Sequence, residues 1–148
     1  DPFGPDGLKF ETIRKLAKLN RMDILLHFPI GSIKRNLGTW LKSKSTILDD
    51  FLGTKQWRNA IDGQSSDKIF KVLIDIFTEQ LKSIGYPEEG LRIAPSDGDI
   101  YTGLPTVPVK NTKEVDLYVL ILASKHSLAQ KIWNSVIKTS PQGERKLF

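Results

Sequence analysis

Cysteine is absent from the chain, and histidine occurs only at His27 and His126. Without cysteine the chain forms neither a disulfide scaffold nor a zinc–thiolate site. No group of His, Asp and Glu residues shows the spacing of metal ligands either. We therefore expect no structural or catalytic metal ion.

Long apolar runs and low-complexity tracts are also missing. No apolar run approaches the roughly 20 residues of a membrane-spanning helix, and the first residues resemble neither a signal peptide nor a transit peptide. The 148 residues, of which 39% are hydrophobic and 26% charged, suit a single globular domain. We expect a cytoplasmic protein without a membrane partner.

Negative charge is in the minority, with 17 Asp and Glu against 22 Lys and Arg, and the formal net charge is +5. The basic residues form small groups, which a solvated surface around amphipathic helices explains as well as contact with a polyanion does. This charge permits nucleic acid as a partner without requiring it.

The first part of the chain alternates between strand and helix patterns. Asp1-Pro2-Phe3-Gly4 is typical of a strand that exits into a loop, because proline and glycine end strands. Residues 8–20 carry apolar side chains on one face and predict a helix. Residues 22–28 are almost continuously apolar, as expected of a parallel strand covered on both faces. This alternation is typical of a doubly wound α/β sheet.

The middle of the chain is predicted to be helical. Residues 32–62 form short helical segments with breaks, and this insertion is too long for a simple connector. It contains Trp40 and Trp57. Residues 65–86 have apolar side chains at helical spacing over a broad face and predict the longest helix.

The last part of the chain predicts a hairpin and a helix. Residues 106–109 contain Pro108, which cannot donate to a strand ladder, so this segment is expected at a sheet edge. Residues 115–123 are the most apolar run and predict a central strand. A short turn joins the two strands as an antiparallel hairpin. Ser127 and Gln130 form a capping box for a last helix.

Together these elements predict a mostly parallel, Rossmann-like sheet with a terminal antiparallel hairpin and the helical insertion at 32–62. The arrangement resembles the C-terminal half of a class I methyltransferase sheet. The glycine-rich loop for S-adenosylmethionine belongs to the other half, and no G-x-G-x-x-G turn follows a strand here. We therefore expect residues 1–148 to be a single partial domain whose cofactor side lies upstream of Asp1.

Stretches over essentially the whole chain, in order, resemble the three-Cys-motif partner protein family. They are Asp1–Pro5 with Gly7, ILLHFP at Ile24–Pro29, KRNL at Lys34–Leu37, FLGTKQWRNA at Phe51–Ala60, YVLILASKHSLAQKIW at Tyr118–Trp133, and Gly143 leading to Leu147-Phe148. The resemblance implies a class I methyltransferase-like fold with an upstream half that holds S-adenosylmethionine. Whether the family is catalytic stays open.

Asp1 and Phe3 are the candidate catalytic residues. Their tetrapeptide stands where amino-methyltransferases have a [D/N/S]-P-P-[Y/F/W] motif, which accepts hydrogen bonds from the target amino group and stacks on a flipped acceptor. Asp1 would orient the amino group, and Phe3 would stack. Phe3 replaces the second proline of that motif, and Gly4 stands at its aromatic position. A strand-ending turn with a capping Asp and a core Phe is therefore the alternative.

Four further residues are candidates for binding substrate. His27 lies at the carboxyl end of the predicted strand and binds substrate or assists proton removal, or else it is a partly buried structural histidine. Arg35 and Asn36 lie at a predicted helix start and hold a phosphate or carboxylate, or else they are a solvated first turn. Trp57 with Arg58 forms a platform for a base, or else Trp57 packs a short helix onto the core.

Lys125 and His126 directly follow the predicted central strand. If that strand runs antiparallel to its neighbours, its end lies on the rim opposite the substrate crevice. We therefore expect these two residues to cap an element or to contact an interface, and we do not place them in catalysis.

Two functions stay open on the sequence. In the first, the full-length protein transfers a methyl group from S-adenosylmethionine to a nitrogen of nucleic acid or a base-like acceptor, and this chain alone is inactive. In the second, the chain is a non-catalytic module that binds a partner protein or nucleic acid. A sheet that begins at Asp1 lacks its innermost strand, so we also expect self-association through an exposed apolar edge.

Overall fold

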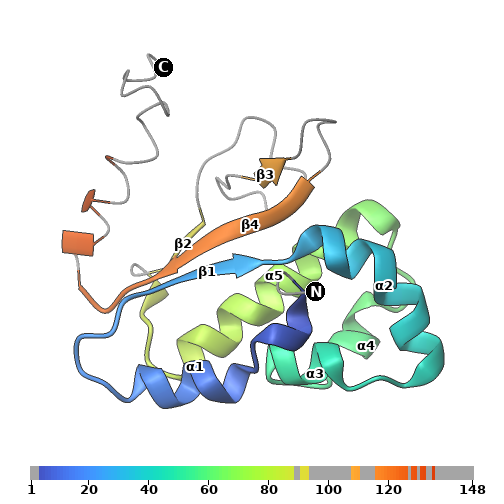
Figure 1. Ribbon diagram of the computed structural model, residues 1–148, viewed down its shortest axis with the longest axis horizontal. Coiled ribbons are helices and arrows are strands. Elements are labelled where there is room, and N and C mark those ends of the chain that lie inside the picture. Colours follow the sequence, from blue (N-terminus) through green and yellow to red (C-terminus); the bar gives the residue numbers. More distant parts are fainter. Residues whose placement is uncertain are drawn as a thin grey trace.

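The structure is a computed structural model that describes residues 4–88, 91–93, 108–110, 116–126, 128–129, 131–132 and 135. Helices cover one face of a small sheet (Figure 1). In chain order the elements are the 3₁₀ helix η1 (Pro5–Gly7), α1 (Phe10–Ala17), β1 (Ile24–Phe28), α2 (Ile30–Ser43), α3 (Ile47–Leu52), α4 (Trp57–Ile61), α5 (Ser66–Ser83), β2 (Leu91–Ile93), β3 (Pro108–Lys110) and β4 (Asp116–Ala123).

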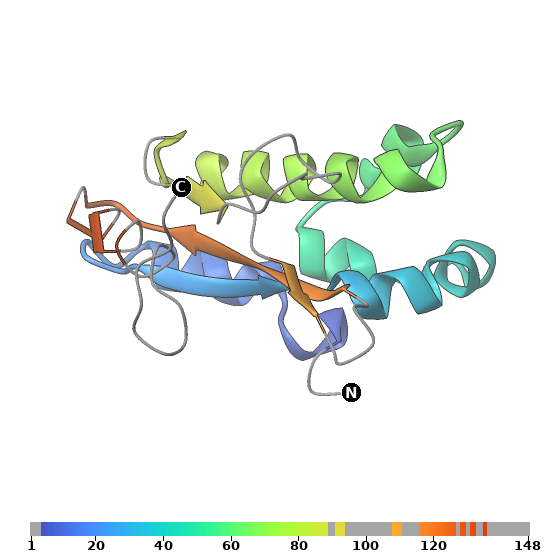
Figure 2. The same ribbon diagram turned by 90° about the horizontal axis from the view of Figure 1, so that it is seen from above.

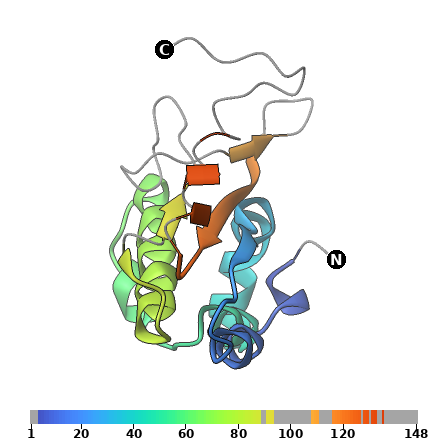
Figure 3. The same ribbon diagram turned by 90° about the vertical axis from the view of Figure 1, so that its left-hand side faces the viewer.

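β4 is the centre of the sheet. β1 pairs with one edge of β4, from Ile24 opposite Ala123 to Phe28 opposite Val119. β2 and β3 both pair with the other edge of β4. All three pairings are antiparallel. Viewed from one end, α5 and α1 lie side by side beneath the sheet, each toward a different edge of it (Figure 3).

The prediction of a mostly parallel, Rossmann-like sheet is wrong, because every strand pairing in the described residues is antiparallel. The apolar run of β1 was interpreted as a parallel strand covered on both faces. Leu26 and Phe28 are indeed buried, but Leu25, which precedes them and points to the other face, is 56% exposed. A short apolar run indicates burial and does not give the direction of the neighbouring strand.

Several local predictions agree with the structure. The helices predicted at 8–20 and 65–86 are α1 and α5, each shorter than predicted at both ends. β4 is central and β3 pairs antiparallel with it, as expected of the two hairpin strands. The residues predicted as a helical insertion, 32–62, form most of α2 and all of α3 and α4, and their buried side chains join the common core. The predicted last helix falls largely outside the described residues.

Four phenylalanines join β1 to three helices at the centre of this core. Phe51 of α3 and Phe77 of α5 are stacked, with ring centroids 5.2 Å apart. Phe28 of β1 meets them edge-on at 5.5 and 5.6 Å, and Phe10 of α1 meets Phe77 edge-on at 5.9 Å. Such pairs contribute about 0.5–1.5 kcal/mol each beyond the area that they bury. The cluster therefore fixes the helices against the sheet.

α2 follows directly after β1 and runs on past the end of the sheet (Figure 2). Its buried apolar residues Ile30, Ile33 and Trp40 are 0, 0 and 9% exposed and lie on the side that faces the core, whereas Leu41 is 42% exposed. Helical periodicity then turns the opposite side of α2 toward solvent. The core contacts of α2 thus fix the position of its solvent-exposed side.

We predict that Gly53→Ala destabilises the protein more than Gly63→Ala. Both glycines have a left-handed backbone, with φ of 73° and 71°, and an alanine there costs about 1–2 kcal/mol. At Gly53 an added Cβ would also lie 2.6 Å from the Phe10 ring, whereas at Gly63 it meets no atom of the described residues within 4 Å. Urea unfolding of the two variants measures the difference. Equal losses of stability would show that Phe10 does not constrain Gly53.

Candidate functional site

The solvent-facing side of α2 gathers positive charge. Five of its exposed residues, Lys34, Arg35, Gly38, Thr39 and Lys42, form what we call the cationic face of α2. Lys34, Gly38 and Lys42 are spaced four residues apart, as are Arg35 and Thr39, so the five residues form two adjacent rows on one side of the helix. No Asp or Glu occurs in the sequence from 24 to 48. The cationic face therefore has no carboxylate from its own helix to neutralise it.

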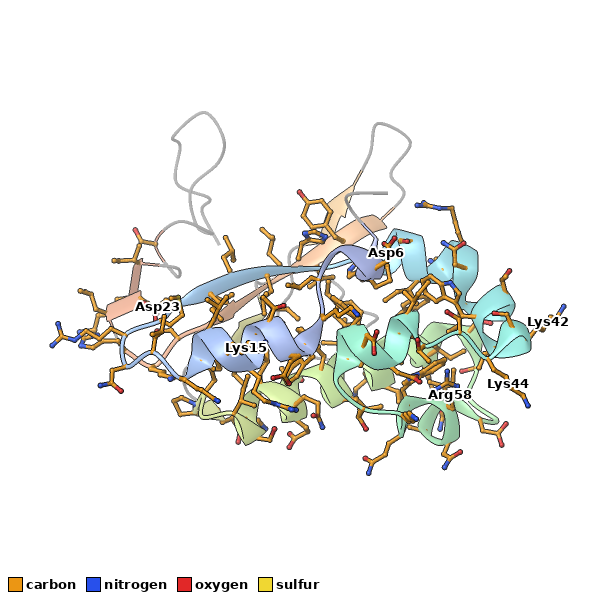
Figure 4. The ribbon with its side chains drawn as sticks, turned by 60° about the horizontal axis from the view of Figure 1, so that its bottom comes forward. Asp6, Lys15, Asp23, Lys42, Lys44 and Arg58 are labelled. Atoms are coloured by element: carbon orange, nitrogen blue, oxygen red, sulfur yellow. The ribbon has the colours of Figure 1, made fainter. Side chains whose placement is uncertain are left out.

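The basic side chains of α2 differ in what they contact. The Lys34 ammonium lies 5.5 Å from the ring centroid of Phe70 on α5. Lys42, and Lys44 just after the helix, form no ion pair with any residue in the described part of the chain. Both lie at the same end of the molecule and project outward from it (Figure 4). Their charges are thus available to a partner.

The two candidate residues on α2 do not lie at the helix start. α2 begins at Ile30, so Arg35 and Asn36 are in its second turn. The Asn36 side chain donates to the backbone carbonyl of Ser32 at 2.9 Å, while Arg35 is exposed on the cationic face. The prediction that they lie at a helix start is wrong, because α2 begins at Ile30, before the helical segment predicted from residue 32.

Trp57 is part of the core. Its side chain is 0% exposed, and its indole Nε1 donates to the Asp49 carboxylate at 2.7 Å. Arg58 forms an ion pair with the same carboxylate and donates to the backbone carbonyl of Ser45 at 2.7 Å. A fully buried ring offers no face to a base, so the geometry supports the packing alternative for Trp57. Asp49, Trp57 and Arg58 hold α3 and α4 together.

His27 lies on β1, opposite Leu120 of β4. Its ring is half-buried and lies 5.4 Å from the ring centroid of Tyr118. Asp1 and Phe3 lie outside the described residues. The structure therefore places His27 on the sheet, Arg35 on an exposed helix and Trp57 in the core, and it leaves the two catalytic candidates as predictions.

Lys125 caps the C-terminal end of α1, as the sequence led us to expect. Its ammonium donates to the carbonyls of Ala17 and Leu19, the latter at 3.2 Å. A cation in this place satisfies free carbonyls and opposes the negative end of the helix dipole. His126 accepts a hydrogen bond at Nδ1 from the backbone N–H of Leu128, at 3.1 Å. Both residues stabilise local structure.

Tyr86 is buried beside Lys125 and contacts the segment between α1 and β1. It is 1% exposed, its hydroxyl donates to the carbonyl of Met22 at 3.1 Å, and the Lys125 ammonium lies 5.4 Å from its ring centroid. Burial raises the pKa of Tyr86 above its ordinary value of 10. The phenol stays protonated and continues to donate this hydrogen bond at neutral pH.

A surface cavity of about 420 Å³ lies beside Lys125. One of its cations, Lys125, is already bound to the end of α1. The residues that line it are Asn20, Arg21, Asp23, Lys125, His126, Leu128, Ala129 and Ile132. The cavity therefore adds less available charge than the cationic face of α2 does.

The sequence did not identify Gly38, Thr39 and Lys42 of the cationic face, or Lys44 just after the helix, as candidate binding residues. The available signal was the segment from 24 to 48, which contains Lys34, Arg35, Lys42 and Lys44 and no acidic residue. Only the structure shows that this charge lies on one exposed helix and its end, because burial separates the solvent side from the core side.

Comparison of the chain with models of protein families, with curated proteins and with solved structures found no match. The resemblance to the three-Cys-motif partner family therefore stays a prediction. None of the helices that the structure describes combines the length and the apolar character needed to cross a membrane. Among the same residues, no group of three or more His, Asp and Glu side chains is placed to hold a metal ion.

We predict that Asp49→Ala destabilises the protein by about 1–3 kcal/mol, because it leaves the buried Trp57 donor and the Arg58 guanidinium without their shared acceptor. The matched control is Asp50→Ala on the same helix. Asp50 makes an exposed pair with Lys9 at 3.5 Å, and such a pair is worth about 0–1 kcal/mol. Chemical unfolding of both variants tests this, and a larger loss in Asp50→Ala would contradict it.

Proposed function

We propose that the described part of the chain is a nucleic-acid-binding module and that the cationic face of α2 is its contact surface. The supporting observation is a single exposed helix that carries basic residues along its solvent side and no carboxylate. Phosphate groups are the partners that such a surface attracts, and their neutralisation releases counterions. The formal net charge of +5 favours the same partner.

The spacing of the basic residues suits a phosphate backbone. Lys34 and Lys42 lie on the same side of α2, about 12 Å apart along the helix axis. Measured along the axis of a duplex, each strand carries one phosphate per about 3.4 Å, so this length spans roughly three to four phosphates. A run of evenly spaced phosphates therefore offers each lysine a partner. Lys44 extends the charge beyond the last turn.

The exposed apolar residues favour a duplex over two other partners. In the described part of the chain, the large exposed hydrophobic side chains are all aliphatic. Single-stranded nucleic acid is bound by stacking bases on exposed aromatic rings. Protein interfaces have a core enriched in aromatic side chains. A surface of cations without exposed rings matches phosphate contacts along a duplex.

Methyl transfer from S-adenosylmethionine to a nitrogen stays a second, untested prediction. It depends on Asp1 and Phe3, which lie outside the described residues, and on the family resemblance. The binding surface proposed on α2 stands without that activity. Calorimetry with S-adenosylmethionine on the full-length protein tests methyl-donor binding separately.

We predict that replacing Lys42 and Lys44 together by Gln weakens duplex binding more than replacing Lys15 and Lys18 together by Gln. Both double variants lose the same charge, but Lys15 lies on α1, away from Lys42 and Lys44 (Figure 4). Fluorescence anisotropy with a labelled mixed-sequence DNA duplex at several salt concentrations provides the measurement. Each lost phosphate contact should reduce the slope of log K against log salt by about 0.9.

Equal effects of the two double variants would show that net charge alone drives binding. An unmodified chain that does not bind the duplex at low salt would overturn the proposed function. Thermal unfolding of both variants checks that they remain folded.

We also propose that a second copy of the chain pairs with β1. β1 is an edge strand in the described sheet, and an unpaired strand edge is a template for another strand. Leu25 on β1 is 56% exposed and would be covered by such a partner.

We predict that Leu25→Lys reduces self-association, because a lysine on an edge strand opposes strand pairing. Leu16→Lys on α1 is the control, since Leu16 is also exposed, at 38%. Sedimentation at increasing protein concentration measures the association. A chain that stays monomeric at high concentration would contradict the role of β1.

A further inference from the structure

Gly38 lies in the middle of α2, and no contact with the described residues accounts for a glycine there. Apart from its own stretch of helix, a Cβ atom added to Gly38 would meet no atom of the described residues within 4 Å. Gly38 is not among the residues with a positive φ, so its backbone suits any side chain. Glycine in a helix interior is less stable than alanine, because it loses more conformational freedom on folding. The residue is thus less favourable than a methyl group would be.

Lys44 shows the opposite case: a side chain stands where glycine would be more stable. It follows α2 with φ 54° and ψ 33°, and its backbone N–H donates to the carbonyl of Trp40. This left-handed position at a helix end favours glycine, because a Cβ atom is crowded there. Among the described residues, Lys44 is the only non-glycine with a positive φ, while Gly53, Gly63 and Gly85 occupy the other such positions.

Both departures occur on the same exposed helix or its end. The chain carries a glycine where alanine would be more stable, and a lysine where glycine would be more stable. Such local conflicts are expected at functional sites, where a residue serves a partner and not the fold. Their common feature is what they present outward: a gap in the surface at Gly38 and a positive charge at Lys44.

Helix geometry explains how a gap at Gly38 would serve binding. Lys34 lies four residues before Gly38 and Lys42 lies four residues after it, so the three residues form one row along the helix. Glycine permits close approach of a backbone to a ligand. A side chain at Gly38 would hold a rigid partner away from the helix and lengthen the contacts of both lysines.

From this arrangement we infer that a nucleic-acid duplex comes closest to the protein at Gly38, with its phosphate backbone over this glycine between Lys34 and Lys42, and with Lys44 on a neighbouring phosphate. The inference rests on the proposed function and adds its contact point. The duplex is DNA or RNA, since the phosphate backbone is common to both.

The test compares Gly38→Ala, Gly38→Gln and Lys44→Gly with the unmodified chain. The probes are a labelled 20-base-pair DNA duplex and an RNA duplex of the same sequence, followed by anisotropy at fixed salt. We expect Gly38→Ala and Lys44→Gly to unfold at a higher temperature than the unmodified chain and yet to bind more weakly. The loss should be severalfold, and larger for Gly38→Gln than for Gly38→Ala.

The matched control is Thr12→Gln, which enlarges an exposed residue on α1 without changing charge. Its affinity should equal that of the unmodified chain. The duplex that shows the larger Gly38→Gln effect is the preferred partner, and equal effects on both duplexes support recognition of the shared phosphate backbone.

Two results would overturn the inference while the proposed function stands. The first is unchanged duplex affinity in Gly38→Gln together with weakened binding in the Lys42 and Lys44 double variant. The second is weaker binding in Gly38→Ala that follows from a lower unfolding temperature. If the unmodified chain binds neither duplex, or binds poly-glutamate as tightly as the duplexes, both the proposed function and this inference fail.

Discussion

Phe28 at the end of β1 packs edge-on against Phe51 and Phe77, which belong to α3 and α5. α2 starts at Ile30, directly after this anchored strand. The direction of α2 is therefore set by the aromatic cluster, and its side of Ile30 and Ile33 is held in the core. The solvent side of α2, with its cationic face, follows from that contact.

The cations of the chain fall into two groups that sequence alone does not separate. Arg58 is bound to the buried Asp49 carboxylate, and Lys125 is bound to the carbonyls at the end of α1. These charges hold elements together. Lys42 and Lys44 have no such duty among the described residues. A polyanion can therefore bind Lys42 and Lys44 without breaking contacts that stabilise the fold.

Sequence periodicity predicted the helices α1 and α5 and the central place of β4, because a one-sided or continuous apolar pattern reports burial. It did not predict strand direction, since the apolar run of β1 is compatible with parallel or antiparallel neighbours. Arg35 was identified as an anion-binding candidate, but for a helix start that lies elsewhere. Gly38 and Lys44 were missed, because only a backbone angle and an empty surface show that each residue departs from the most stable choice.

A titration of the isotope-labelled chain with a DNA duplex, followed by amide chemical shifts, shows directly which surface binds the duplex. We predict that the amides from 34 to 44, in α2 and at its end, shift most, with a maximum near Gly38, while those of Lys15 and Lys18 change little. Shifts confined to α1 or to the edge of β1, or no shifts at low salt, would contradict the assignment of duplex binding to the cationic face of α2.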